Sequence, residues 1–158
     1  MAEKTKEDFR QKESSLTGEL AIGSGELRSS RFLARVLASF QKQHPLVRYE
    51  VYSGNSDNIK ERIEQGTLDL GILVEPVDIS KYEFIRLPEK ETWGVLVRED
   101  SELAEKEKVK PEDLVGVPLI MTRRIMLQNE IFHWFGSYAE EINIVAGNGN
   151  VFGNNRGG

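Results

Sequence analysis

The stretch that decides the fold of this chain is Leu20–Gly71, LAIGSGELRSSRFLARVLASFQKQHPLVRYEVYSGNSDNIKERIEQGTLDLG. Short apolar runs alternate in it with segments of helical period, and turn residues separate the two. The pattern predicts strand, helix, strand, helix and strand in that order. Strands joined through helices are parallel, so the stretch indicates a βαβαβ unit.

The first helix of this unit is expected to end at His44-Pro45, because proline disfavours the α conformation in the residue before it. Its apolar residues recur at helical spacing and predict one buried stripe, whereas the arginines fall mostly elsewhere. The stripe comprises Phe32, Val36, Leu37 and Phe40, with Leu33 beside it.

The second helix follows a turn, Ser53–Ser56, in which Ser56 is the predicted N-cap. Ile59 and Ile63 mark its apolar side, and Gly66 is expected to close it. The third strand, Leu68–Val74, is nearly all apolar, as in a strand that is buried on both faces.

Several of these features fall in one ordered motif, F-x-x-x-H-P-x-V-x-x-x-V-x-x-G-N-S-x-x-I-x-x-x-I-x-x-G-x-L-D-L-G-I, from Phe40 to Ile72. The motif resembles the effector-binding domain of LysR-type transcriptional regulators, and the similarity extends from about Leu16 to about Ile144. The resemblance implies an α/β fold of two Rossmann-like lobes, similar to type II periplasmic binding proteins. The first lobe is expected over 17–98, and the second, incomplete, over 99–146.

The two ends of the chain lie outside these lobes. Residues 1–16 are polar and are expected to form either a solvated tail or the end of the family's linker helix. No helix-turn-helix precedes them in this sequence, so the resemblance implies that DNA binding belongs to an absent segment. Residues 147–158 are almost only glycine and asparagine and predict a flexible tail.

Between the lobes the pattern predicts extended segments at 82–87 and 92–97, followed by a solvated, charged crossover at 98–113. A buried strand is expected over Leu114–Met121. Thr122 is placed to cap a helix that runs from Arg123 toward Tyr138, and Ile142–Val145 predicts a last strand.

Composition limits the function classes. Hydrophobic residues make up 39% and charged residues 30% of the 158 positions, which is typical of a soluble globular protein. A net charge of −5 disfavours duplex DNA binding by this chain itself. The absence of cysteine excludes disulfides and thiolate chemistry. With a charged start and no long apolar run, we expect no membrane contact and a cytoplasmic location.

Ligands of open α/β sheets bind beyond the carboxyl ends of the strands, near helix N-termini. This rule selects four places: 23–27, 53–56, 74–75 and 121–124. The resemblance implies pocket-lining positions for Leu27, Ser56, Val74 and the Thr122 region, in a cleft between the lobes. The candidate effector-binding residues are Ser24, Glu26, Leu27, Asn55, Ser56, Val74, Glu75, Thr122 and Arg123.

The chemistry of these side chains leaves the ligand open. The hydroxyl and amide groups suit a polar metabolite, and Arg123 or Arg124 could hold a carboxylate. Glu26 and Glu75 would instead suit an amine-bearing effector. Each residue also has a structural alternative: Ser56 and Thr122 as helix caps, the arginine pair as solvated charge, and Glu75 as a loop residue.

Catalysis has little support in the sequence. His44 sits at a helix end, and His133 lies in an apolar helix where core packing is the simpler interpretation. Neither histidine has a metal-type partner at i+3 or i+4. No nucleophile elbow, P-loop or dinucleotide fingerprint is present. We therefore expect no catalytic residue, no metal and no cofactor.

We interpret the chain as a sensor that binds a small-molecule effector and acts on DNA only through the absent helix-turn-helix domain. The alternatives are a stand-alone solute-binding protein of the same fold and, third, an enzyme. The resemblance also implies a homodimer, with a tetramer open for the parent protein. The expected dimer surface comprises Arg28, Arg31, Phe32, Arg35, Tyr49 and Tyr52.

Overall fold

The computed structural model describes residues 3–6 and 16–148, and its chain divides into two compact units. The first unit holds the described residues up to Leu73 together with Leu87–Glu91. The second holds Val74–Arg86 and the described residues from Thr92 onward. This division falls earlier in the chain than the lobe boundary expected near residue 98. It does not test that boundary, which stays a prediction.

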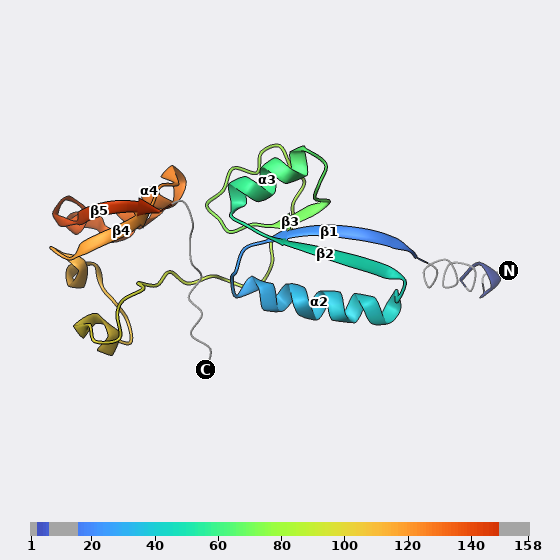
Figure 1. Ribbon diagram of the computed structural model, residues 1–158, viewed down its shortest axis with the longest axis horizontal. Coiled ribbons are helices and arrows are strands. Elements are labelled where there is room, and N and C mark those ends of the chain that lie inside the picture. Colours follow the sequence, from blue (N-terminus) through green and yellow to red (C-terminus); the bar gives the residue numbers. More distant parts are fainter. Residues whose placement is uncertain (1–2, 7–15, 149–158) are drawn as a thin grey trace. The chain divides into compact units, whose positions relative to one another are not determined.

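The first unit is a parallel α/β sheet. Its elements are β1 (Gly18–Ser24), α2 (Ser29–Gln43), β2 (Val47–Ser53), α3 (Ser56–Glu64) and β3 (Leu70–Ile72). The strands are all parallel in the order β2-β1-β3, and α2 and α3 lie on opposite faces of the sheet (Figure 1). The predicted βαβαβ unit is therefore confirmed.

Two glycines let α3 approach this sheet closely. A side chain at Gly23 would lie 2.8 Å from both Ile59 and Leu68, and one at Gly71 would also collide with Ile59. Ile59 is 1% exposed as a result, and Ile22 in the central strand is equally buried. The absence of these two side chains is thus a packing requirement of the α3 face.

The predicted stripe of the first helix is only partly buried. Leu33 faces the core, but Val36 and Phe40 are exposed. The helix does end where proline predicts: Gln43 is its last residue, and the His44 N–H donates to the Phe40 carbonyl at 2.8 Å. A helix on a three-stranded sheet buries one narrow side, so the wider apolar stripe exceeds what the described sheet covers.

The third strand is shorter than predicted. Only Leu70–Ile72 pair with β1, and within this strand Leu70 is exposed while Gly71 and Ile72 are half-buried. The prediction of a strand buried on both faces was therefore wrong. Gly66, with φ of +74°, closes the preceding helix as expected.

The extended segments predicted at 82–87 and 92–97 do not form strands. Among the described residues no strand lies between Ile72 and Pro118. Ile85 and Leu96 are almost fully exposed. A period-two pattern makes a strand only when another strand bonds to it, and no described strand pairs with these segments.

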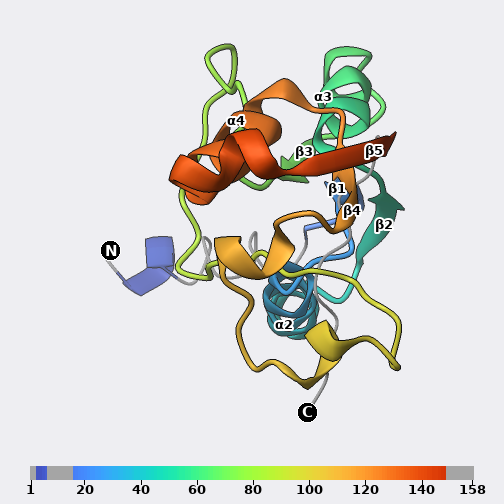
Figure 2. The ribbon, with the colours of Figure 1, turned by 90° about the vertical axis from the view of Figure 1, so that its left-hand side faces the viewer.

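The second unit contains a smaller parallel pair, β4 (Pro118–Thr122) and β5 (Asn143–Asn148), with α4 (Ile125–Phe135) packed beside it (Figures 1 and 2). The register shifts between Leu119 and Ile120. Short 3₁₀ turns occupy the charged crossover, Glu102–Glu105 and Pro111–Leu114, and a third, Gly136–Glu141, follows α4.

The core of this unit is a cluster of Leu114, Met121 and Phe135, around which partly buried apolar residues pack. Leu114 lies in a 3₁₀ turn rather than in the predicted strand. The helix ends at Phe135, short of Tyr138, because Gly136 adopts a positive φ of 55°.

The predictions for the chain ends fall mostly on residues outside those described. Residues 3–6 are helical, and the glycine and asparagine run joins β5 at Gly147 and Asn148. The linker-helix and tail predictions for the other terminal residues are therefore untested.

Candidate functional site

The carboxyl edge of the first sheet gathers the loops that follow β1 and β2. Ser24 ends β1, is 4% exposed, and its hydroxyl donates to the Gly25 carbonyl at 3.1 Å. The Gly54 N–H donates to the Ser24 carbonyl at 3.2 Å and joins the two loops. Glu26 comes within 3.5 Å of the Ser53 hydroxyl, which donates to it.

The β1–α2 loop is braced by Ser30. The Ser30 hydroxyl donates to the Gly25 carbonyl at 2.7 Å and accepts from the Leu27 N–H at 3.3 Å. These bonds fix the backbone on either side of Glu26, whose side chain remains exposed. The loop therefore presents a carboxylate on a braced backbone.

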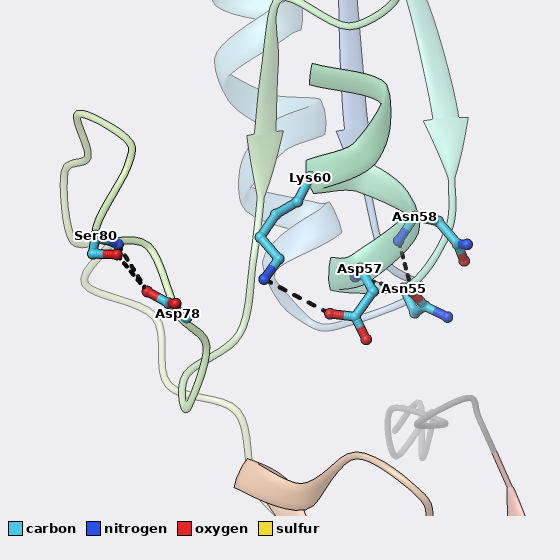
Figure 3. A network of polar contacts seen from close by, with 6 residues as sticks. All are labelled: Asn55, Asp57, Asn58, Lys60, Asp78 and Ser80. Carbon is cyan, nitrogen blue, oxygen red and sulfur yellow. Dashed lines mark hydrogen bonds and ion pairs between the residues drawn. The ribbon is translucent and has the colours of Figure 1, made fainter. Parts of the chain in front are cut away.

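Asn55, and not Ser56, is the N-cap of α3. Its side-chain oxygen accepts from the N–H groups of Asp57 and Asn58 at 3.0 and 2.9 Å (Figure 3). Ser56 is the first helical residue and is 7% exposed. The prediction of Ser56 as the cap was wrong by one residue, because the longer Asn side chain reaches both N–H groups.

The turn before this cap depends on Gly54. A side chain there would meet the Tyr52 ring at 2.7 Å. The Arg62 guanidinium lies over the same ring, with its central carbon 4.0 Å from the ring centre. Tyr52 is therefore half-buried within its own unit rather than exposed, and the surface it offers is smaller than expected.

The N-terminus of α2 has no local side-chain cap and no acidic residue in its first turn. Glu91 fills this role from far along the chain: its carboxylate accepts from the Ser29 N–H at 2.8 Å and from the Arg28 N–H at 3.3 Å. Sequence reasoning missed this contact, because nothing in a separation of 62 residues signals it.

In the second unit Glu75 pairs with Arg86 rather than standing alone. The Arg86 guanidinium donates to the Glu75 carboxylate at 2.9 and 3.5 Å. This hydrogen bond, with the opposite charge, raises the pKa of Arg86. A groove of about 520 Å³ lies nearby, lined by Glu75, Pro76, Val77, Met126 and Glu130.

Thr122 does not cap α4 in the predicted way. The helix begins after Arg124, and the Thr122 hydroxyl accepts from the Arg124 N–H at 3.2 Å. The Gln128 amide donates to the Thr122 carbonyl at 2.6 Å. Thr122 is 8% exposed, so its groups are used in organising the turn. Arg123 is exposed and lies over Gly147.

The structure thus brings the predicted residues together in two sets. Ser24, Glu26, Leu27, Asn55 and Ser56 share the carboxyl edge of the first sheet. Val74, Glu75, Thr122 and Arg123 belong to the second unit, where Glu75 lines the groove with Met126 and Glu130. Met126 and Glu130 are on one helix face at i and i+4, a spacing that could have selected them.

The residues expected at a dimer surface lie at the N-cap of α2, on α2 itself and on β2. Arg28, Arg31 and Arg35 are exposed, and Phe32 and Tyr49 are partly buried. Arg35 forms an ion pair with Glu89 at 3.3 Å. Val36, Phe40 and Val51, on the same two elements, add exposed apolar surface.

Among residues 3–6 and 16–148, no group of histidine, aspartate and glutamate side chains is arranged to hold a metal. Within the same residues, none of the helices combines the length and apolar character that crossing a bilayer requires.

The family follows from comparison with known proteins. Residues 13–150 match the model of the LysR substrate binding domain. The chain belongs to this family. Its two-lobe, periplasmic-binding-protein-like fold class accordingly agrees with the α/β units seen here, and the expectation drawn from the Phe40–Ile72 motif is confirmed.

The sequence of this LysR domain is also similar to those of HTH-type transcriptional regulators. The HTH-type transcriptional regulator YwbI of Bacillus subtilis is 28% identical over 72% of this chain and 38% of its own length. YvbU of the same organism is 27% identical over 66% of this chain and 35% of its own length. The chain thus spans little more than a third of these relatives.

Solved structures give the same fold. HinK, a LysR family transcriptional regulator from Pseudomonas aeruginosa, matches 94% of this chain and 51% of its own with a TM-score of 0.58 and 20% identity. The cofactor-binding domain of the Cbl transcriptional regulator matches 87% of this chain and 61% of its own, with a TM-score of 0.58 and 22% identity.

Proposed function

We propose that this LysR domain senses a small polar metabolite and passes the signal to a helix-turn-helix domain outside the chain, which binds DNA. The observation that carries the proposal is the carboxyl edge of the first sheet, where two loops and two helix N-termini meet in a domain of this family. Ligands of parallel α/β sheets bind at such an edge. The proposed function is regulation and not catalysis.

The proposed effector contacts are the residues expected from the sequence, with roles refined by their neighbours. Ser24, Leu27, Asn55 and Ser56 would supply neutral groups in the first unit, and Glu26 a charge. Val74, Glu75, Thr122 and Arg123 would supply the contacts of the second lobe. Glu75 would then present its carboxylate as part of an ion pair with Arg86.

We further propose a cytoplasmic homodimer formed through α2 and β2. The exposed apolar residues Val36, Phe40 and Val51 support this surface, beside the arginines of α2. Effector binding would shift the equilibrium between two conformations of the regulator, and only by as much as its affinities for the two conformations differ. The solute-binding alternative has no specific support, since the relatives are HTH-type regulators.

The first test is a thermal melt of the chain, followed by circular dichroism, with a panel of amino acids, amines, carboxylates and phosphorylated metabolites. A ligand that binds only the native state at 100 times its Kd adds about 2.7 kcal/mol to the free energy of unfolding. One chemical class should raise the melting temperature. A panel that shifts nothing would count against effector binding by this chain.

Ser56→Ala tests the site with whichever compound shifts the melt. Because Asn55 supplies the cap, the substitution should leave the melting temperature nearly unchanged while weakening binding by about tenfold, the loss of one hydrogen bond. Calorimetric titration measures the affinity. Ser137→Ala, an exposed serine in the second unit, is the matched control and should bind as the wild type does. Unchanged affinity in Ser56→Ala would remove Ser56 from the site.

A further inference from the structure

Residues 87–91 are the one part of the described chain that returns to the first unit after the second has begun. Two glutamates in this segment contact α2. Glu91 accepts from the backbone of Ser29 and Arg28, and Glu89 pairs with Arg35 at 3.3 Å. The segment is therefore held to α2 by two carboxylates that are two residues apart.

The stronger of these contacts is the one at the helix terminus. The first N–H groups of an α-helix lack internal partners and carry partial positive charge, which favours a carboxylate there. The residue at the cap position is Arg28, whose side chain makes no capping hydrogen bond. The Glu89 pair is exposed on the Arg35 side, and such pairs add little.

A second observation marks the same terminus. Ser29 is 6% exposed, and its hydroxyl has no hydrogen-bond partner among the described residues, although its N–H holds Glu91. The helix start therefore combines a bound carboxylate with a buried, unused hydroxyl one residue inside the cap.

We propose that Glu91 is an internal anion that occupies the N-terminus of α2 and straps residues 87–91 to the first unit. The N–H groups of Arg28 and Ser29 are then not available to a carboxylate of an effector. Glu26, at the same edge of the sheet, adds negative charge. This edge accordingly selects an effector that presents a neutral or amine-bearing group to it, a conclusion on ligand class that rests on the proposed function.

Chemical rescue tests the internal anion without any effector. Glu91→Ala should lower the melting temperature by about 2 to 8 °C, the shift expected for a lost helix cap. Formate, the smallest carboxylate, should bind the N–H groups left without Glu91 and restore part of this loss when compared with chloride at equal ionic strength. Glu91→Gln keeps the volume without the charge and should not be rescued.

The matched control is Glu83→Ala, which removes an exposed glutamate of the neighbouring loop. Neither this variant nor the wild type should respond to formate beyond the response to chloride. The proposal is overturned if Glu91→Ala melts as the wild type does, or if formate stabilises Glu83→Ala and Glu91→Ala equally.

The strap itself can be followed through Trp93, two residues beyond Glu91 and partly exposed. The chain has two tryptophans, so a Trp134→Phe background isolates the signal of Trp93. In this background Glu91→Ala should raise the quenching of Trp93 by acrylamide, and formate should lower it again. Quenching that is the same with and without Glu91 would show that the segment is held by something else.

A separate binding measurement tests the conclusion on ligand class. If a compound from the panel binds the wild type, its carboxylate analogue should bind Glu91→Ala more tightly than it binds the wild type, by about tenfold. Equal affinity for both would overturn this conclusion. A panel without any binder would defeat the proposed function and leave the formate result to decide the internal anion.

Discussion

The two units share a strand–helix–strand arrangement but differ in how regularly their strands pair. Each contains two parallel strands joined through a helix, β1–α2–β2 in the first and β4–α4–β5 in the second. In the first, all seven residues of β1 pair in unbroken register with β2, and a third strand and a second helix complete the layer. In the second, the register shifts within a single pair of strands.

The helices of the two units are held in place by different contacts. The first unit packs aliphatic side chains against glycine backbone, and its helix starts are capped by Asn55 and Glu91. At the start of α4 the Arg124 side chain makes no capping bond, and Thr122 accepts only from the Arg124 N–H, ahead of the first helical residue. The support of α4 comes instead from the buried cluster around Phe135. One strand–helix–strand pattern can thus depend on caps or on a single large core residue.

The largest expected effect is the loss of this aromatic residue. Phe135→Ala should destabilise the second unit by about 3 to 5 kcal/mol, since Phe135 is 2% exposed and packs on Leu114 and Met121. The fluorescence of Trp134, whose ring centre is 5.1 Å from that of Phe135, reports the unfolding in a Trp93→Phe background. A melt unchanged by the substitution would show that the second unit does not depend on Phe135.

A smaller loss is expected from overpacking the first unit. Gly23→Ala adds a methyl group against Ile59 and Leu68 and should cost about 1 to 3 kcal/mol. Ile59→Ala, which removes both γ carbons that this methyl group would meet, should cost less when combined with Gly23→Ala than the sum of both. Urea denaturation of the four proteins gives the coupling. Strict additivity would mean that the two positions do not meet.

The helix cap comes next. Asn55→Ala should destabilise α3 by about 1 kcal/mol, whereas Asn55→Asp, which keeps the accepting oxygen, should lose little. Melting by circular dichroism compares both with the wild type. If the two variants lose equal stability, the side-chain oxygen is not what holds the helix start.

The smallest effect concerns acid stability of the second unit. The Lys110 N–H at 2.8 Å and the Lys106 ammonium at 3.0 Å lower the pKa of Asp113. The stability that Asp113 contributes is therefore fully present above the ordinary aspartate pKa near 4, and is lost as the pH falls through its lower folded value.

Asp113→Asn should remove this acid dependence. The variant should be less stable than the wild type at neutral pH and approach it as the pH falls far enough to protonate Asp113 in the folded state, where both side chains are neutral. Urea midpoints at a series of pH values measure the difference. A gap that does not narrow on acidification would assign the role of Asp113 to packing.

The candidate site shows how far local reasoning reaches. The rule that ligands bind beyond the carboxyl ends of strands selected Ser24, Glu26, Leu27, Asn55 and Ser56, and the structure places all five at one edge of one sheet. Their roles as effector contacts stay predictions. The same reasoning missed Arg86, because the partner of an exposed carboxylate depends on loop geometry that no periodicity encodes.

The order of strands and helices in Leu20–Gly71, their parallel arrangement, and the helix ends at His44-Pro45 and Gly66 could all be predicted from the sequence. These follow from periodicity and turn chemistry, which act between residues a few positions apart. Three features could not be predicted and emerged from the fold: Leu70 is exposed, 92–97 lacks a partner strand among the described residues, and Glu91 caps α2. Each of these depends on contacts between distant segments, whose free energy is set by which surfaces meet rather than by local spacing.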